Sequence, residues 1–194
     1  MGCGPSAQTG VRSKAHASAT PAAPRKDGML YDIFLTHDWG KDELGRDNHQ
    51  RVASLNEELK KHNLVTWFDS EKMQDNITDQ MTSGIDKSCV IVVFVTQRYV
   101  QKVAQTENAR DNCKLEFNYA SMRKPGLLIS VVMEKRMQNS ADWNGPVGMH
   151  LSGNLYQLFV DDSDLKGTAQ RIADEVKRLK AKAGVGTVSE PAGA

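Results

Sequence analysis

The sequence predicts an α/β protein in three layers, with a five-stranded parallel sheet between two layers of helices. Two observations predict it. Short apolar runs alternate along the chain with segments of helical periodicity, and residues 89–96 form a continuous run of mostly β-branched residues bounded by polar ones. Such alternation is typical of βαβ units, and an uninterrupted apolar strand indicates burial on both faces.

The five strands follow from apolar runs rich in β-branched and aromatic residues. The predicted strands span residues 31–36, 64–68, 89–96, 127–133 and 155–160. In an open parallel sheet, ligands bind beyond the carboxyl ends of the strands. The segments after Thr36, Phe68 and Thr96 are therefore the first candidates for a functional site.

Four helices are predicted from apolar residues that recur at spacings of three and four. The third is expected to begin after the polar stretch at residues 97–111, and Ser163 with Asp164 is expected to cap the last. The marking residues are Val52, Leu55 and Leu59; Ile77, Met81 and Ile85; Cys113, Phe117 and Ala120; and Leu165, Ala169, Ile172, Val176 and Leu179.

Length and composition favour one soluble domain. The chain has 194 residues, of which 39% are hydrophobic and 25% charged, enough for one core but too few for two ordinary domains. Its formal charge of +1 argues against a nucleic-acid binder, which would need a broad positive field. Three unpatterned cysteines predict neither a disulfide framework nor a zinc site and indicate a reducing compartment. No run has the length of a membrane span, and residues 1–30 lack the apolar core of a secretory signal.

The first six residues, Met-Gly-Cys-Gly-Pro-Ser, fit the N-myristoylation pattern. One myristoyl chain binds membranes only marginally, so Cys3 beside Gly2 is the expected site of a palmitoyl chain. The residues that follow are small, polar or basic, so we expect residues 1–28 to be a disordered acylated tether, 29–182 a folded domain and 183–194 a disordered tail. The expected location is the cytoplasmic face of a membrane, most simply the plasma membrane. The alternative is a glycine-rich start that no transferase modifies.

Residues 31–37, Tyr-Asp-Ile-Phe-Leu-Thr-His, resemble the first box of the TIR (Toll/interleukin-1 receptor) domain family. Further boxes match in order, and the resemblance extends from residue 30 to about residue 180. It implies a flavodoxin-like fold. The other boxes are Phe68-Asp69 with residues 71–73 for the second strand and BB loop, residues 77–88 for the following helix, residues 92–99 for the central strand, and Cys113 to Glu116 for the Cys-x-x-Glu segment of the third helix.

The resemblance implies signalling by self-association and, in one branch of the family, hydrolysis of NAD to nicotinamide and ADP-ribose or a cyclic form. Glu116 occupies the position of the catalytic glutamate of that branch. One carboxylate suffices because nicotinamide leaves as a neutral molecule without a general acid, and a single anion can stabilise an oxocarbenium-like transition state. Without the resemblance, a glutamate on a helix is usually only solvated. NAD is a substrate in this interpretation, and no cofactor is expected.

The resemblance also implies residues that bind NAD. His37 and Trp39 follow the first strand, where family members contact nicotinamide, and Trp39 could stack on the pyridinium ring or only pack at the rim. Ile77 falls in the BB-loop region, where the family contacts substrate from a neighbouring protomer, although anchoring the second helix in the core is its simpler role. The chain departs from the family pattern at Asn76, where a BB-loop glycine is usual, and at Asn112, where a tryptophan often precedes the glutamate.

Other site chemistries lack a pattern. The five histidines are scattered, so no metal site is predicted, and neither a Walker A segment nor a dinucleotide-binding glycine motif is present. Cys113 and Cys89 are most simply buried structural thiols. Two functions therefore remain: a membrane-tethered NAD hydrolase that is active as a homo-oligomer, and a non-catalytic adaptor that recruits other TIR domains. Glu116 favours the first, and the departures at Asn76 and Asn112 favour the second.

Overall fold

The computed structural model describes residues 28–68 and 77–184, and these residues contain the predicted parallel sheet. Its five strands lie in the order β2-β1-β3-β4-β5, and each neighbouring pair is parallel. Their bounds are β1 Tyr31–Thr36, β2 Thr66–Phe68, β3 Ser88–Val95, β4 Leu128–Val132 and β5 Tyr156–Leu158. The predicted fold class, a flavodoxin-like sheet between helices, is confirmed.

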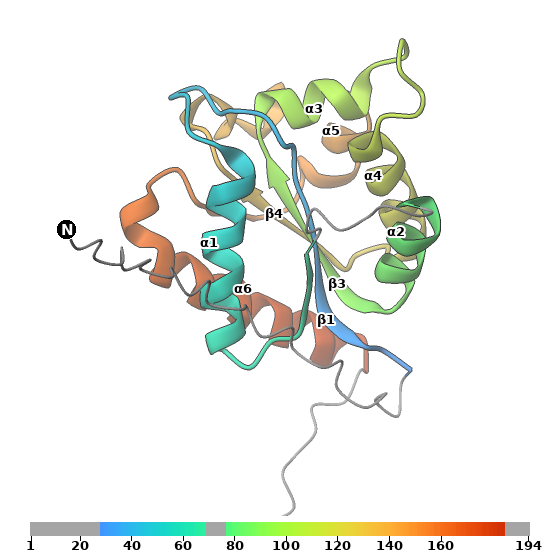
Figure 1. Cartoon of the computed structure of the whole chain (residues 1–194), viewed down its shortest axis with the longest axis vertical. Helices are drawn as coiled ribbons and strands as arrows, with labels where there is room; N and C mark the ends of the chain where they lie inside the picture. Colours follow the sequence, from blue (N-terminus) through green and yellow to red (C-terminus); the bar gives the residue numbers. More distant parts are fainter. Residues whose placement is uncertain (1–27, 69–76, 185–194) are drawn as a thin grey trace, which may run out of the picture.

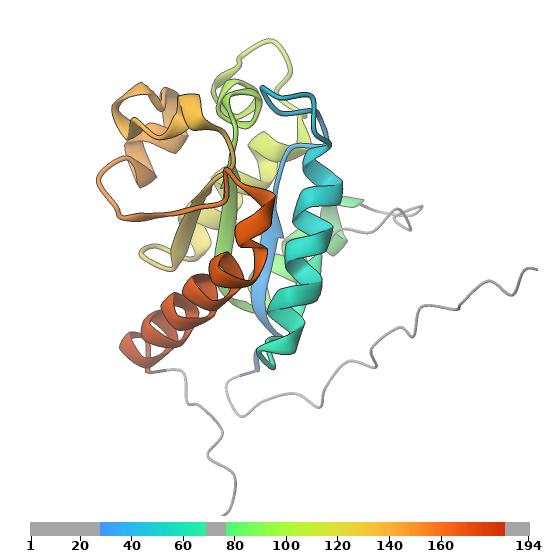
Figure 2. The same ribbon diagram turned by 90° about the vertical axis from the view of Figure 1, so that its left-hand side faces the viewer.

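Helices cover both faces of the sheet (Figure 1). One layer consists of α1 and α6, which lie side by side in Figure 2; α2, α3, α4 and α5 form the other. The bounds are α1 Asn48–Lys61, α2 Ile77–Asp86, α3 Gln97–Ala104, α4 Asn112–Arg123, α5 Gly145–Leu151 and α6 Leu165–Lys182.

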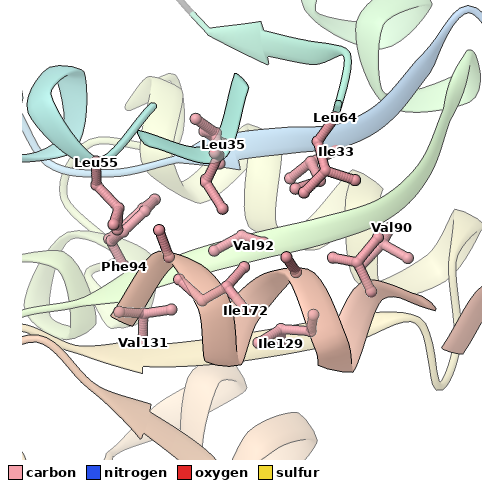
Figure 3. Packing of buried hydrophobic residues seen from close by; sticks show 14 of the residues in the cluster. Ile33, Leu35, Leu55, Leu64, Val90, Val92, Phe94, Ile129, Val131 and Ile172 are labelled. Carbon is pink, nitrogen blue, oxygen red and sulfur yellow. The ribbon is translucent and has the colours of Figure 1, made fainter. Parts of the chain in front are cut away.

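Two apolar cores lie on opposite sides of the sheet because successive side chains of a strand point to opposite faces. Ile33 and Leu35 of β1 pack toward α1 and α6, whereas Phe34 between them packs toward the other layer. Figure 3 shows the first core, in which Ile172 of α6 reaches toward the sheet. All eight residues of β3 are buried, which explains the uninterrupted apolar run in the sequence.

The polar stretch at residues 97–111 contains a helix, α3, that its polarity conceals. Tyr99, Val100 and Val103 are buried on one side of this helix. The Thr96 hydroxyl caps it by accepting a hydrogen bond from the backbone N–H of Tyr99 at 3.0 Å. The helix predicted to follow residue 111 is α4, which begins at Asn112, whereas α3 is absent from the prediction. A second short helix, α5, is also absent from the prediction, because its glycines and its proline are weak helix signals in sequence.

The structure departs from the predicted bounds most clearly at the fifth strand, and from the predicted cap at the last helix. The run at 155–160 forms only the three-residue strand β5, which lies at the edge of the sheet, and Leu155 before it is 96% exposed. Asp164 occupies the N-cap position of α6 but makes no capping hydrogen bond with its side chain. Tertiary contacts along α6, where Ala169, Ile172 and Val176 are fully buried, stabilise this helix in place of a strong cap.

The predicted tether with Gly2 and Cys3, the BB-loop position Asn76 and the C-terminal tail lie outside the described residues. The predicted domain boundaries stay predictions for the same reason. Within residues 28–68 and 77–184, none of the helices combines the length and the apolar character needed to cross a bilayer.

Candidate functional site

A polar cleft of about 410 Å³ opens at the carboxyl edge of the sheet, beyond the end of β1. Its volume lies within the range of about 300–1,000 Å³ that is usual for small-molecule sites. The cleft is formed by the segment after β1, by α3, by the connection between α3 and α4, and by the first turns of α4. Its lining residues are His37, Trp39, Lys102, Asn108, Arg110, Asp111, Asn112, Cys113 and Glu116.

Glu116 lies in this cleft, on the second turn of α4, but it is not on the outside of the fold. Only 8% of its surface is exposed, and its Oε2 accepts a hydrogen bond from the Thr36 hydroxyl at 2.6 Å. Phe117 and Ala120 face the core as predicted. Glu116 is buried and not solvated, as a glutamate on a helix usually is, because the start of α4 packs against the end of β1 and leaves Glu116 between them.

His37 and Trp39 belong to a stack of aromatic rings beside the cleft. The Nε2 atom of His37 is 2.8 Å from Nδ1 of His49, and the ring of His49 lies between those of Trp39, at 4.0 Å, and Phe68, at 5.0 Å. Burial, with a further contribution from His49, lowers the pKa of His37 to about 3. His37 is therefore neutral near pH 7, whereas Trp39 keeps 46% of its surface exposed.

An ion cluster holds the mouth of the cleft together. The buried carboxylate of Asp38 lies 3.1 Å from Nε of Arg98 and 3.2 Å from Nζ of Lys102. Lys102 also approaches Asp111 Oδ2 at 3.5 Å, and Asp111 caps α4 by accepting from the backbone N–H of Cys113 at 2.9 Å. These contacts fix the segment after β1 relative to the start of α4.

Sequence reasoning did not identify four polar residues that line the cleft. The residues are Lys102, Asn108, Arg110 and Asp111. The last three lie within four consecutive positions, 108–111, of the predicted polar stretch, and this concentration of charged and amide side chains was the available signal. Lys102 gave none, since its helix was not predicted.

Cys113 lines the same cleft but is poorly suited to act as a nucleophile. It is buried, and this burial raises the pKa of its thiol above the usual value. Its Sγ lies 3.6 Å from the carbonyl oxygen of His37, to which it donates. A protonated, buried thiol is inert, so the structural interpretation of Cys113 agrees with its surroundings. Cys89 is likewise buried.

The structure brings together His37, Trp39 and Glu116, three of the predicted site residues, around one cleft. Ile77 is the first residue of α2, but its side chain lies outside what the structure describes. The same holds for Gly2, Cys3 and the segment that follows Phe68. The described residues contain no group of three or more His, Cys, Asp or Glu side chains placed to hold a metal ion.

Comparisons with known proteins agree with this fold. The TIR domain family profile matches residues 33–170, which is more than half of the chain. The crystal structure of the TIR domain of the Toll-related receptor TRR-2 from Hydra magnipapillata is similar to this chain, with a TM-score of 0.50. That similarity covers 76% of this chain and 98% of the Hydra domain at 11% sequence identity, so it shows the fold alone. No curated protein matches the chain. From the fold and the family match, the chain belongs to the TIR domain family.

Proposed function

We propose that this TIR-domain signalling protein hydrolyses NAD to nicotinamide and ADP-ribose, or to a cyclic form of that product, when its protomers assemble. The observation that carries the proposal is the position of Glu116, whose carboxylate lies in one cleft with His37 and Trp39. This is the carboxyl edge of the sheet, where ligands of open parallel sheets bind.

Each cleft residue suits a part of this chemistry. The Glu116 carboxylate would lie beside the ribose and stabilise the positive charge that develops as the bond to nicotinamide breaks. Nicotinamide leaves as a neutral molecule without a general acid because it takes the electron pair of the broken bond. Water adds to the ribose carbon, and the proton that this water loses passes to solvent. The half-exposed ring of Trp39 offers a π face to the cationic pyridinium, and the exposed guanidinium of Arg110 suits a diphosphate.

Assembly and membrane attachment complete the proposal. TIR domains associate with other TIR domains, and we propose that the active form is a homo-oligomer in which the BB loop with Ile77 faces the cleft of a neighbour. Acyl chains on Gly2 and Cys3 would hold the protomers at the cytoplasmic face of a membrane, most simply the plasma membrane. Tethering in two dimensions raises the local protomer concentration and favours assembly without any new contact.

A second function, that of a non-catalytic adaptor acting through TIR–TIR contacts, is favoured by one specific observation. Glu116 is 8% exposed and its carboxylate accepts a hydrogen bond from Thr36, so Glu116 also joins α4 to β1. A glutamate in that position has a structural use even without NAD. Asn112, at the position where a tryptophan often precedes the catalytic glutamate in the family, also favours the adaptor function.

Nicotinamide release decides between the two functions. Protein carrying an N-terminal polyhistidine tag is incubated with NAD at increasing concentration, in solution and on vesicles with nickel-chelating lipid. We expect release per protomer to rise with concentration and on vesicles. Glu116→Gln should lower the rate by about 10²–10³, the usual effect of removing one preorganised electrostatic partner.

The control is Glu57→Gln on α1, an exposed glutamate far from the cleft, with melting curves for all three proteins. Equal release by wild type and Glu116→Gln would refute the assignment of the site. A wild-type protein that releases no nicotinamide even on vesicles, while still self-associating, would establish the adaptor function instead.

A further inference from the structure

Three buried polar groups meet behind the cleft, and each comes from a different element. Thr36 ends β1, Tyr99 lies on α3, and Glu116 lies on α4. The Thr36 Oγ1 atom is 2.6 Å from Glu116 Oε2 and 3.1 Å from the Tyr99 hydroxyl oxygen. Thr36 is 1% exposed and Tyr99 is fully buried, so these contacts are shielded from solvent.

The donors in this chain follow from the number of protons. A threonine hydroxyl has one proton, and Thr36 donates it to the carboxylate of Glu116. Tyr99 must then donate to the Thr36 oxygen. Burial raises the pKa of Tyr99 well above its usual value, so the phenol keeps the proton that this direction requires. The result is a relay of two hydroxyl groups that ends on Glu116.

We propose that Thr36 and Tyr99 are positioning residues, which aim the Glu116 carboxylate into the cleft and hold it in its ionised form. The proposal rests on the proposed function of Glu116. Hydrogen bonds to a charged acceptor are about twice as strong as neutral ones, and linked hydroxyl groups polarise one another. A carboxylate buried between α4 and β1 needs such donors to stay charged.

Thr36 and Tyr99 lie on regular elements of the fold, so their hydroxyl groups can hold the Glu116 side chain in one orientation. Thr36 is paired with Val93 in the neighbouring strand β3. Tyr99 is fixed by its backbone bond to the Thr96 cap and by edge-on contact of its ring with Phe117, with ring centroids 6.4 Å apart. Neither hydroxyl lines the cleft, so both act through Glu116 and not on substrate.

Matched variants separate this role from a purely structural one. Thr36→Val keeps the shape of the side chain and removes the hydroxyl, Thr36→Ser keeps the hydroxyl, and Tyr99→Phe removes the first donor. The controls are Thr168→Val, which removes a partly buried hydroxyl bond to the carbonyl of Leu158, and Tyr156→Phe, which removes an exposed hydroxyl bond to the carbonyl of Gln138. Both bonds involve residues of β5, at an edge of the sheet.

We expect Thr36→Val to lower kcat by about 10- to 100-fold with little change in KM, the equivalent of one hydrogen bond to a charged group. The acidic limb of its pH–rate profile should move up by about one to two pH units. Thr36→Ser should restore most of the rate. Tyr99→Phe should lower kcat and shift the acidic limb in the same directions but by less, since Tyr99 reaches Glu116 only through the Thr36 hydroxyl. Both controls should have the rate and pH profile of the wild type.

A second measurement does not depend on hydrolysis. In protein labelled with ¹³C at glutamate carboxyl groups, the Glu116 resonance is assigned by its loss in Glu116→Gln and titrated with pH. The midpoint of this Glu116 titration should rise in Thr36→Val and in Tyr99→Phe, and should be close to the wild-type midpoint in Thr36→Ser. If Thr36→Val does not fold, Tyr99→Phe and Thr36→Ser still carry both tests.

A midpoint that is the same in Tyr99→Phe and Thr36→Val as in the two controls would overturn the relay, whether or not the protein hydrolyses NAD. An absence of nicotinamide release by wild type together with a shifted midpoint would refute the proposed hydrolysis and leave the relay supported. The two failures are therefore distinguishable.

Discussion

The buried histidine beside the cleft makes the stability of the domain depend on pH. The pKa of His37 is about 3 in the folded protein, first because the ring is buried and then because His49 is close, and about 6.5 in the unfolded chain. Between these values the unfolded chain binds a proton that the folded protein excludes. The free energy of unfolding therefore falls as the pH drops below about 6.5.

The size of the effect follows from the two pKa values. At pH 5 the His37 contribution is a loss of about 2 kcal/mol relative to pH 8, and the full loss, complete only below about pH 3, is about 5 kcal/mol. Carboxylates with lowered pKa, such as Asp42 and Asp86, stabilise the fold at higher pH and lose that contribution only below about pH 4. The interval from pH 7 to pH 5 therefore separates the His37 contribution from those of these carboxylates.

The assay is urea unfolding of wild type, His37→Phe and His150→Asn at pH 7, 6 and 5. Phenylalanine keeps an aromatic ring in the stack but cannot titrate, and His150 is an exposed histidine. We expect the free energy of unfolding to fall toward pH 5 in wild type and His150→Asn and to stay nearly level in His37→Phe. A fall of the same size in His37→Phe would refute the reasoning, as would a wild type without any fall.

Three further predictions concern the network at the sheet edge, the packing of α2 and the N-terminus. Arg51 donates hydrogen bonds to Asp42 and Asp162 and to the carbonyls of Met133 and Phe159. Arg51→Ala should therefore lower the free energy of unfolding, measured in urea, by about 3–5 kcal/mol. A decrease no larger than that of the exposed Arg178→Ala would contradict this prediction. Alanine at Gly84 in α2 would place its Cβ 2.8 Å from the Trp67 ring. Thermal unfolding of Gly84→Ala should therefore show a destabilisation of about 1–3 kcal/mol, whereas glycine to alanine in a helix usually stabilises by up to about 1 kcal/mol. The control is Gly153→Ala, whose Cβ would have nothing within 4 Å. Gly2→Ala should move the protein from the membrane fraction to the soluble fraction in cells that contain myristoyl transferase, and identical fractionation of the two proteins would rule out acylation as the anchor.

The sequence by itself determined the fold class and the family. The period of the apolar residues depends only on local backbone geometry, so β1, β3 and the periodic helices could be identified without a structure. The central position of β3 was also predictable, because a strand covered on both faces is a nearly continuous apolar run, as residues 89–95 of β3 are. Motif order then placed Glu116, His37 and Trp39 among the candidate residues.

Only the tertiary structure decided how those residues are arranged. The burial of Glu116 depends on Thr36, which is 80 positions away in the chain, and the pairing of His37 with His49 depends on how α1 begins beside the end of β1. The helix α3, with Lys102, is short and polar except for the residues that it buries, so tertiary packing and not local propensity stabilises it. Periodicity along a chain gives the face of an element, but which side chains meet at its ends is set by neighbours that are distant in sequence.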